Sequence, residues 1–148
     1  MSPEAAEAAK AYAIALQKIA ECRESGAKHL DLFNLGLIDL PPEIGELSAL
    51  TGLSLWKNKL TTLPPEIGKL CALTELVLGD NQLTSLPPEI GHLSALTELY
   101  LYENKLTTLP SEIGKLSGLK KLYIQENPLT TLPPEIGQLS ALTVLYLG

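Results

Sequence analysis

Leucines recur along this chain at one fixed period, as they do from Leu53 to Leu76 to Leu99. In each unit a leucine stands two positions before a second leucine, as Leu99 and Leu101 do, or once before an isoleucine, Ile124; this spacing predicts that both point to the same side of a β-strand. At a fixed distance after the strand comes a proline turn with an isoleucine and a glycine, written LPPEIG or LPSEIG, at 40–45, 63–68, 86–91, 109–114 and 132–137. The second proline suits the first position of a short helical or 3₁₀ turn, and the glycine permits a positive φ or a close approach of two backbones.

A single coil of this kind cannot bury its own leucines, so neighbouring coils of equal length are expected to enclose the core between them. Each unit reads LxxLxLxxNxLxxLPPEIGxLxx. Its asparagine is expected to bond backbone groups in the turn where the strand ends. A catalytic or ligand-binding role is the alternative, and the fixed place of asparagine in the repeat argues against it. The stacked coils therefore predict a buried structural ladder of Asn58, Asn81, Asn104 and Asn127.

This unit resembles the leucine-rich repeat family, and more narrowly its bacterial and plant intracellular members with an LPxxIGxLxxL tail. The resemblance covers about residues 27–148 in this chain. The first unit departs from it, because Ala27 replaces a column leucine and Leu35 stands where the asparagine belongs, with Asn34 one place early. The resemblance implies an α/β solenoid that has a curved parallel β-sheet on its concave face and turns and short helices on its convex face. Residues 27–148 would form one continuous array of about five repeats plus a final strand.

Residues 1–26 do not follow the repeat and predict an N-terminal capping helix. Ser2 is a plausible N-cap, Pro3 suits the first helical turn, and Ser25-Gly26 ends the pattern. An apolar stripe at helical spacing is expected to cover the open end of the first coil. A membrane-bound amphipathic helix is the alternative, which the scarcity of Lys and Arg on the polar face disfavours. The stripe consists of Ala5, Ala9, Tyr12, Ala13, Leu16, Ile19 and Ala20.

The C-terminal end carries no comparable cap. The last residues read LTVLYLG, within a predicted strand, so Leu145 and Leu147 would face a core that no further coil covers. Unpaired strand edges invite pairing with another chain. Two explanations stay open: the sequence is a piece of a longer protein, or the chain forms a homo-oligomer through its C-terminal edge strand.

The strand positions that point away from the leucines are the best candidates for a binding surface. There are eighteen of them, and they hold six of the seven aromatic residues. Strands favour aromatic residues in general, but rings that face solvent in rows on a concave sheet indicate a partner-binding site. Val77 and Gly79 are expected to leave a shallower band between two aromatic groups. The predicted partner-binding residues are Phe33, Trp56, Glu98, Tyr100, Tyr102, Tyr123 and Tyr146.

Charge narrows the class of partner. The formal net charge is −6 at neutral pH, which disfavours nucleic acid and anionic membranes. No apolar run approaches the about 18 residues that would span a bilayer. The acidic residues near the aromatic positions predict a protein partner with basic and apolar groups. Cys22 and Cys71 read as free, at least half-buried thiols of a cytoplasmic protein.

The residues that carry chemistry are sparse. His29 and His92 stand nearly three repeats apart, so they cannot share a proton relay or a metal ion. The cysteines lack metal-ligand spacing, and no phosphate-binding loop or nucleophile elbow is present. We therefore predict no catalytic residues, no metal and no cofactor.

Three functions remain in view. The first is a scaffold for protein–protein interaction through the concave face. The second is a regulatory segment of a larger signalling protein, because such repeats with a similar helical lead-in precede the GTPase module of Roco-type proteins, a further resemblance. The third is a self-assembling structural unit.

Overall fold

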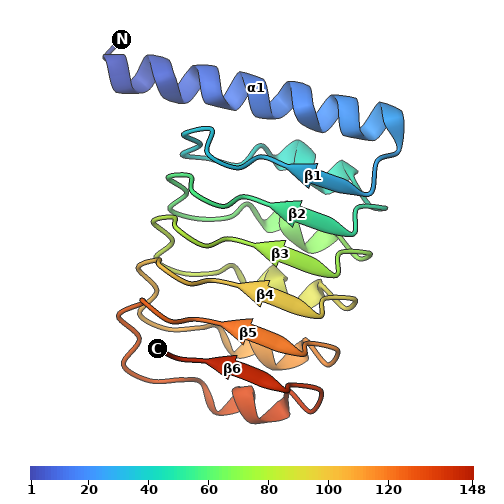
Figure 1. Cartoon of the computed structure of the whole chain (residues 1–148), viewed down its shortest axis with the longest axis vertical. Helices are drawn as coiled ribbons and strands as arrows, with labels where there is room; N and C mark the ends of the chain where they lie inside the picture. Colours follow the sequence, from blue (N-terminus) through green and yellow to red (C-terminus); the bar gives the residue numbers. More distant parts are fainter.

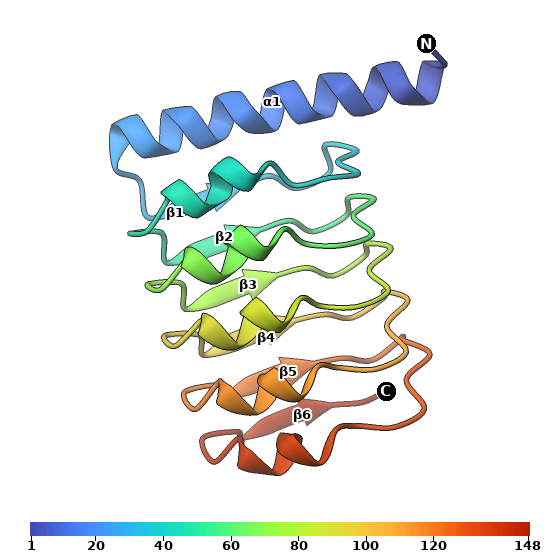
Figure 2. The same cartoon turned by 180° about the vertical axis from the view of Figure 1, so that it is seen from behind.

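The computed structural model describes residues 1–148 as one helix followed by a stack of coils, each with a short strand and a turn of 3₁₀ helix behind it (Figures 1 and 2). Helix α1 spans Pro3–Ser25. The strands are β1 (His29–Asp31), β2 (Gly52–Ser54), β3 (Glu75–Val77), β4 (Glu98–Tyr100), β5 (Lys121–Tyr123) and β6 (Val144–Tyr146). The 3₁₀ helices are η1 (Pro42–Glu46), η2 (Pro65–Lys69), η3 (Pro88–His92), η4 (Ser111–Lys115) and η5 (Pro134–Gln138).

The strands form one parallel sheet whose order is the order of the chain, β1 to β6. Every pair keeps the same offset, so that Leu53 lies beside Leu76 and Leu76 beside Leu99. A change in the length of any coil would shift this register and move each leucine out of its column. The predicted α/β solenoid with an N-terminal helical cap is confirmed.

The leucine and isoleucine columns fill one continuous core that runs from α1 to the last coil. In the middle coils Leu76, Ile90 and Leu99 have no exposed surface. Burying one such side chain contributes about 1.5–3 kcal/mol, so the stacking of coils supplies most of the driving force for folding. The last coil is less well covered, since Leu129, Leu132, Ile136 and Leu142 are only partly buried.

The glycine of an LPPEIG or LPSEIG segment permits a close contact with the next coil where one follows, as at Gly45, Gly68, Gly91 and Gly114. None of these glycines has a positive φ, so of the two roles predicted for them only the close approach applies. A Cβ on Gly68 would lie 2.9 Å from the carbonyl oxygen and the Cβ of Glu89 in the next coil. The glycine thus lets one 3₁₀ helix pack directly against the backbone of the next.

The asparagine side chains tie neighbouring coils together. Asn81 accepts a hydrogen bond from the backbone N–H of Leu60 (3.0 Å), and its Nδ2 donates to the carbonyls of Leu55 (3.0 Å) and Leu78 (3.1 Å). Asn58, Asn81 and Asn104 are buried, whereas Asn127 is half-buried. These amides therefore satisfy buried backbone groups that lie beyond the ends of the strands.

The residue before each asparagine adopts the left-handed conformation. The non-glycine residues with positive φ are Asn34, Lys57, Asp80, Glu103 and Glu126, one at the same place in each successive coil. Asn34 therefore occupies this turn position in the first coil and not the ladder position. The ladder begins one coil later, at Asn58, whose Oδ1 accepts from the N–H groups of Leu35 and Leu37 (both 3.0 Å).

Helix α1 lies across the first coil, as Figure 1 shows. Its ends are those predicted: the Ser2 hydroxyl accepts a hydrogen bond from the N–H of Ala5 (3.1 Å), and Gly26 ends the helix with a φ of 69°. At the end nearer the first coil, Arg23 forms an ion pair with Glu46 of η1.

The predicted apolar stripe of α1 is only partly correct. Ile19 is buried as expected, but Ala5, Ala9 and Ala13 are exposed, and the other side chains buried against the coil are Ala11, Ala15 and Cys22. Alanine occurs on every side of this helix, so the periodicity of apolar residues does not select one face. The small Ala11 and Ala15 side chains let the helix lie close to the coil.

The two cysteines differ in burial. Cys22 is buried, but Cys71 is exposed, so the expectation of two at least half-buried thiols is wrong for Cys71. Cys71 takes a turn position that the other coils fill with an exposed serine, namely Ser48, Ser94, Ser117 and Ser140.

Candidate protein-binding face

The outward side of the sheet carries the predicted partner-binding residues, and we call it the strand face. Three rows of side chains cross it with one residue from each coil, from His29 to Val144, from Asp31 to Tyr146 and from Phe33 to Gly148. In Figure 1 this face is turned toward the viewer, with the 3₁₀ helices behind it. All seven predicted residues lie on it, because inward and outward positions alternate along each strand.

Two aromatic rings form a pair near the N-terminal end of the face. Phe33 follows β1 and Trp56 follows β2, and their rings are stacked with centroids 5.6 Å apart and planes inclined by 9°. Phe33 is 44% exposed and Trp56 36%. The pair therefore presents flat apolar surface to solvent.

Three tyrosines form a second stack at the other end. Tyr100, Tyr123 and Tyr146 occupy equivalent positions on β4, β5 and β6. The centroids are 4.9 Å apart for Tyr100 and Tyr123, and 6.0 Å apart for Tyr123 and Tyr146. Each ring covers a side of the next, so the edges of the stack remain open to a partner.

Tyr102 fills a part of the face that was expected to be shallow. The sequence predicted a shallow band at Val77 and Gly79, but the ring of Tyr102 lies over Gly79, where an added Cβ would come within 2.3 Å of it. Only glycine leaves room for a ring in this position. Tyr102 therefore fills the space between Trp56 and the outer strands of the same row.

The charges of the face centre on Glu98. Its Oε1 accepts a hydrogen bond from the Tyr100 hydroxyl (2.8 Å) and lies 3.6 Å from the Nζ of Lys121. Burial, this hydrogen bond and the negative charges of Glu98 and Glu75 together raise the pKa of Tyr100 well above its usual value. Burial also raises the pKa of Tyr102, with Glu103 and Asp80 adding to the effect. Both phenols are therefore neutral hydrogen-bonding groups at physiological pH.

A hollow in the strand face was not anticipated from the sequence. It lies over β2, where Gly52 has no side chain and Ser54 has a small one. His29, Asp31 and Glu75 surround it. The imidazole of His29 lies over Gly52, since a Cβ there would come within 2.4 Å of its Nδ1. The sequence feature that could have predicted this hollow is the pair of small residues, Gly52 and Ser54, at consecutive outward positions of one strand.

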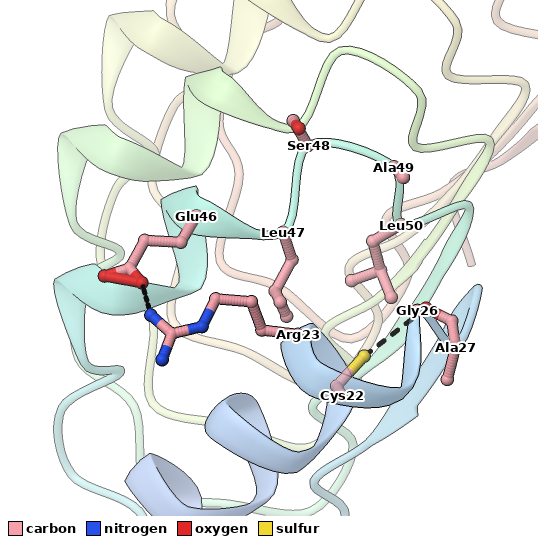
Figure 3. Close-up of a pocket in the computed structure, with 9 residues that line it drawn as sticks. All are labelled: Cys22, Arg23, Gly26, Ala27, Glu46, Leu47, Ser48, Ala49 and Leu50. Carbon is pink, nitrogen blue, oxygen red and sulfur yellow. Dashed lines mark hydrogen bonds and ion pairs between the residues drawn. The ribbon is translucent and has the colours of Figure 1, made fainter.

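A second pocket lies where α1 meets the first coil, and it belongs to the joint between them. Figure 3 shows Cys22, Arg23, Glu46, Leu47 and Leu50 around it. The Cys22 Sγ donates to the carbonyl oxygen of Ala27 (3.4 Å), and burial raises the pKa of this thiol. A protonated, hydrogen-bonded thiol is a poor nucleophile, so the pocket offers no chemistry.

The structure lacks two other kinds of feature. No cluster of three or more His, Cys, Asp and Glu side chains is arranged to hold a metal ion. The structure also contains no helix with the length and apolar character needed to cross a membrane.

Comparison with protein families identifies the class to which the fold belongs. The profile described as "Leucine rich repeat" matches residues 71–129 and 94–148, and a profile for two copies of the repeat matches residues 48–91. The chain belongs to the leucine-rich repeat family. Proteins of this family are typically protein-interaction modules. No curated protein gives a significant match.

Solved structures show the same fold in much longer proteins. YopM from Yersinia enterocolitica is 30% identical, with a TM-score of 0.68 over 90% of this chain and 27% of its own. The plant peptide hormone receptor RGFR1, solved in complex with RGF2, is 36% identical, with a TM-score of 0.69 over 82% of this chain and 22% of the receptor. The ectodomain of GASSHO1/SCHENGEN3 from Arabidopsis thaliana is 32% identical, with a TM-score of 0.70 over 81% of this chain and 15% of its own. This chain thus spans about a quarter or less of these proteins.

Proposed function

We propose that this chain is a protein-interaction module that binds a partner protein through its strand face. The observation that supports the proposal most is the placement of the six outward aromatic rings on the one side of the sheet that packs against nothing. Tyrosine and tryptophan provide large contact areas at a low entropic cost and are enriched among residues that dominate binding energy. Two of the similar plant receptors were solved in complex with a partner, RGF2 in one case and CASPARIAN STRIP INTEGRITY FACTOR 2 in the other.

The proposal assigns binding and no catalysis to the chain. His29 lies at β1 and His92 at η3, on opposite sides of the coils. The phenols of Tyr100 and Tyr102 have raised pKa values, which leaves them weak as bases or nucleophiles at neutral pH. The face thus offers apolar contact, hydrogen bonds and charge.

The dimensions of the face limit the affinity. Six strands at a spacing of about 4.8 Å extend over only about 24 Å. A stable interface buries about 800 Å² on each partner, which is a larger area than strands of this extent present. We therefore expect the turns beside the strands, which carry Asp80, Glu103 and Glu126, to contribute to the contact.

The test compares two triple variants with the original chain. In the face variant Trp56, Tyr100 and Tyr123 become alanine, and in the control variant Lys69, His92 and Lys115 on the 3₁₀ side become alanine. Each protein is immobilised and exposed to a lysate of the source cells, and the captured proteins are quantified by mass spectrometry. Proteins captured equally by the original chain and the control should fall about tenfold or more on the face variant.

Two results would reject this surface. One is an unchanged set of captured proteins on a face variant that keeps the circular dichroism spectrum of the original chain. The other is a loss confined to the control variant, which would move the binding site to the 3₁₀ side.

Self-association is a second candidate function, favoured by the exposed apolar end of the last coil. Leu145 is 38% exposed and Leu147 56%, and Leu147 borders a pocket with Leu129 and Leu132. Light scattering over a hundredfold range of concentration should detect a dimer that Leu147→Lys disrupts. A monomer at every concentration would remove this candidate and leave the first unaffected.

A further inference from the structure

The hollow over β2 lies beside the N-terminal aromatic pair of the strand face. Trp56 lies two residues after Ser54 along the chain, which places it about 7 Å away. Tyr100 lies two strands away on β4, about 10 Å across the sheet and beyond β3. A partner segment that enters the hollow and runs along β2 can therefore reach Trp56.

The carboxylates beside the hollow lack a cationic partner. The ion pairs of the chain are Arg23 with Glu46 and Lys121 with Glu98, so neither Asp31 nor Glu75 takes part in one. Both residues are exposed. Asp31 uses Oδ1 to accept a hydrogen bond from the N–H of Phe33 (3.0 Å), which leaves its other oxygen free. The hollow thus has two carboxylates on its walls, with Ser54 at its base and the imidazole of His29 over Gly52.

The chemistry of the hollow fits an organic cation better than a metal ion. His29, Asp31 and Glu75 do not form a cluster that could coordinate a metal. A guanidinium or ammonium group needs only charge and hydrogen-bond acceptors at one side, and gains further from a nearby indole or phenol face. Trp56 supplies such a face next to the hollow.

We propose that this hollow receives an arginine or lysine side chain from an extended segment of the partner protein, while an apolar side chain of the same segment lies on Trp56. In an extended segment, side chains two residues apart are separated by about 6.6 Å, which matches the distance from the hollow to Trp56. The net negative charge of the chain would speed the approach of such a segment. This inference rests on the proposed function of the strand face and specifies the chemistry that the face selects.

The test is a selection from a displayed library of random twelve-residue linear peptides. The original chain is the target, and the Trp56→Ala, Tyr100→Ala, Tyr123→Ala variant removes peptides that bind elsewhere. The enriched peptides should carry arginine or lysine beside apolar residues. Binding of one such peptide is then measured by the fluorescence of Trp56, the only tryptophan of the chain.

The carboxylates are tested in a double-mutant cycle. Asp31→Asn and Glu75→Gln should each weaken binding about fivefold, while Glu89→Gln in η3 should leave it unchanged. Replacing the basic residue of the peptide with glutamine should weaken binding by a similar factor, and the two losses should not multiply when combined. Binding should also weaken as salt is added.

The outcomes separate the two proposals. Peptides that bind the strand face without a basic residue, or that bind Glu75→Gln and Asp31→Asn as tightly as the original chain, overturn this inference alone. A selection that enriches no peptide for the original chain over the face variant overturns both this inference and the proposed binding face.

Discussion

Replacing Gly91 with alanine places a methyl group in the contact between two coils. The new Cβ would lie 2.8 Å from the carbonyl oxygen of Glu112 and 3.0 Å from its Cβ. Relieving such a contact requires the coils to separate by about 0.5 Å in an interior that is closely packed. Overpacking costs about 1–3 kcal/mol, and the stiffer unfolded chain offsets about 0.4–1 kcal/mol of it. We expect a net loss of about 1–2 kcal/mol.

Gly137 provides a matched control within the same chain. It follows the same Glu-Ile pair in the last coil, and nothing lies within 4 Å of a Cβ added there. Its φ is not positive. Only the effect on the unfolded chain then remains, so Gly137→Ala should stabilise the protein by about 0.4–1 kcal/mol.

The opposite signs can be measured by urea unfolding at two protein concentrations, followed by far-UV circular dichroism. The slope of the free energy with urea should be the same for all three proteins. Equal changes at Gly91 and Gly137 would refute the role of this glycine in coil contact. A loss at Gly137 that grows with protein concentration would instead indicate a second copy packed on η5.

Three further predictions concern single side chains. Asn81→Ala leaves the buried N–H of Leu60 without its partner and should cost about 2–4 kcal/mol in urea unfolding, about twice the cost of Asn127→Ala, where water can enter; equal costs would contradict this. Glu103→Gly relieves a φ of 54° and should raise the free energy of unfolding by up to about 1 kcal/mol, whereas a loss would show that the carboxylate has a structural role. The raised pKa of Tyr100 means that the folded state holds this proton more tightly than the unfolded state. Stability should therefore fall as pH rises above about 10, and Tyr100→Phe should reduce that fall; an identical pH dependence would contradict the assignment.

The repeat made much of the fold predictable. Leu99 and Leu101 identify the inward side of a strand, because residues two positions apart in a strand point to the same side. Their recurrence at one fixed period then fixes the parallel register. The asparagine turn and the 3₁₀ helix could be placed for the same reason. Because every coil must have the same length and the same register, few alternative structures are compatible with the sequence.

Features that are not repeated were harder to predict. The orientation of α1 depends on how Ala11 and Ala15 fit the first coil, and an alanine-rich helix carries no clear periodic signal. The ring of Tyr102 lies over Gly79 because the neighbouring coil has a glycine there. The spacing of residues in the sequence predicts the side of the sheet on which Tyr102 lies but not the rotamer of its side chain. The hollow over Gly52 and Ser54 likewise arises from residues that are missing a side chain or carry a small one.

The strand face and the core depend on opposite roles of adjacent residues in each coil, such as Leu32 and Phe33 directly after β1. The direct test is to measure the free energies of unfolding of Leu32→Ala and Phe33→Ala by urea titration. Leu32 has no exposed surface and Phe33 is 44% exposed. Leu32→Ala should lose about 2–5 kcal/mol and Phe33→Ala about 1 kcal/mol. A larger loss for Phe33→Ala than for Leu32→Ala would show that the rings belong to the core and are not available to a partner.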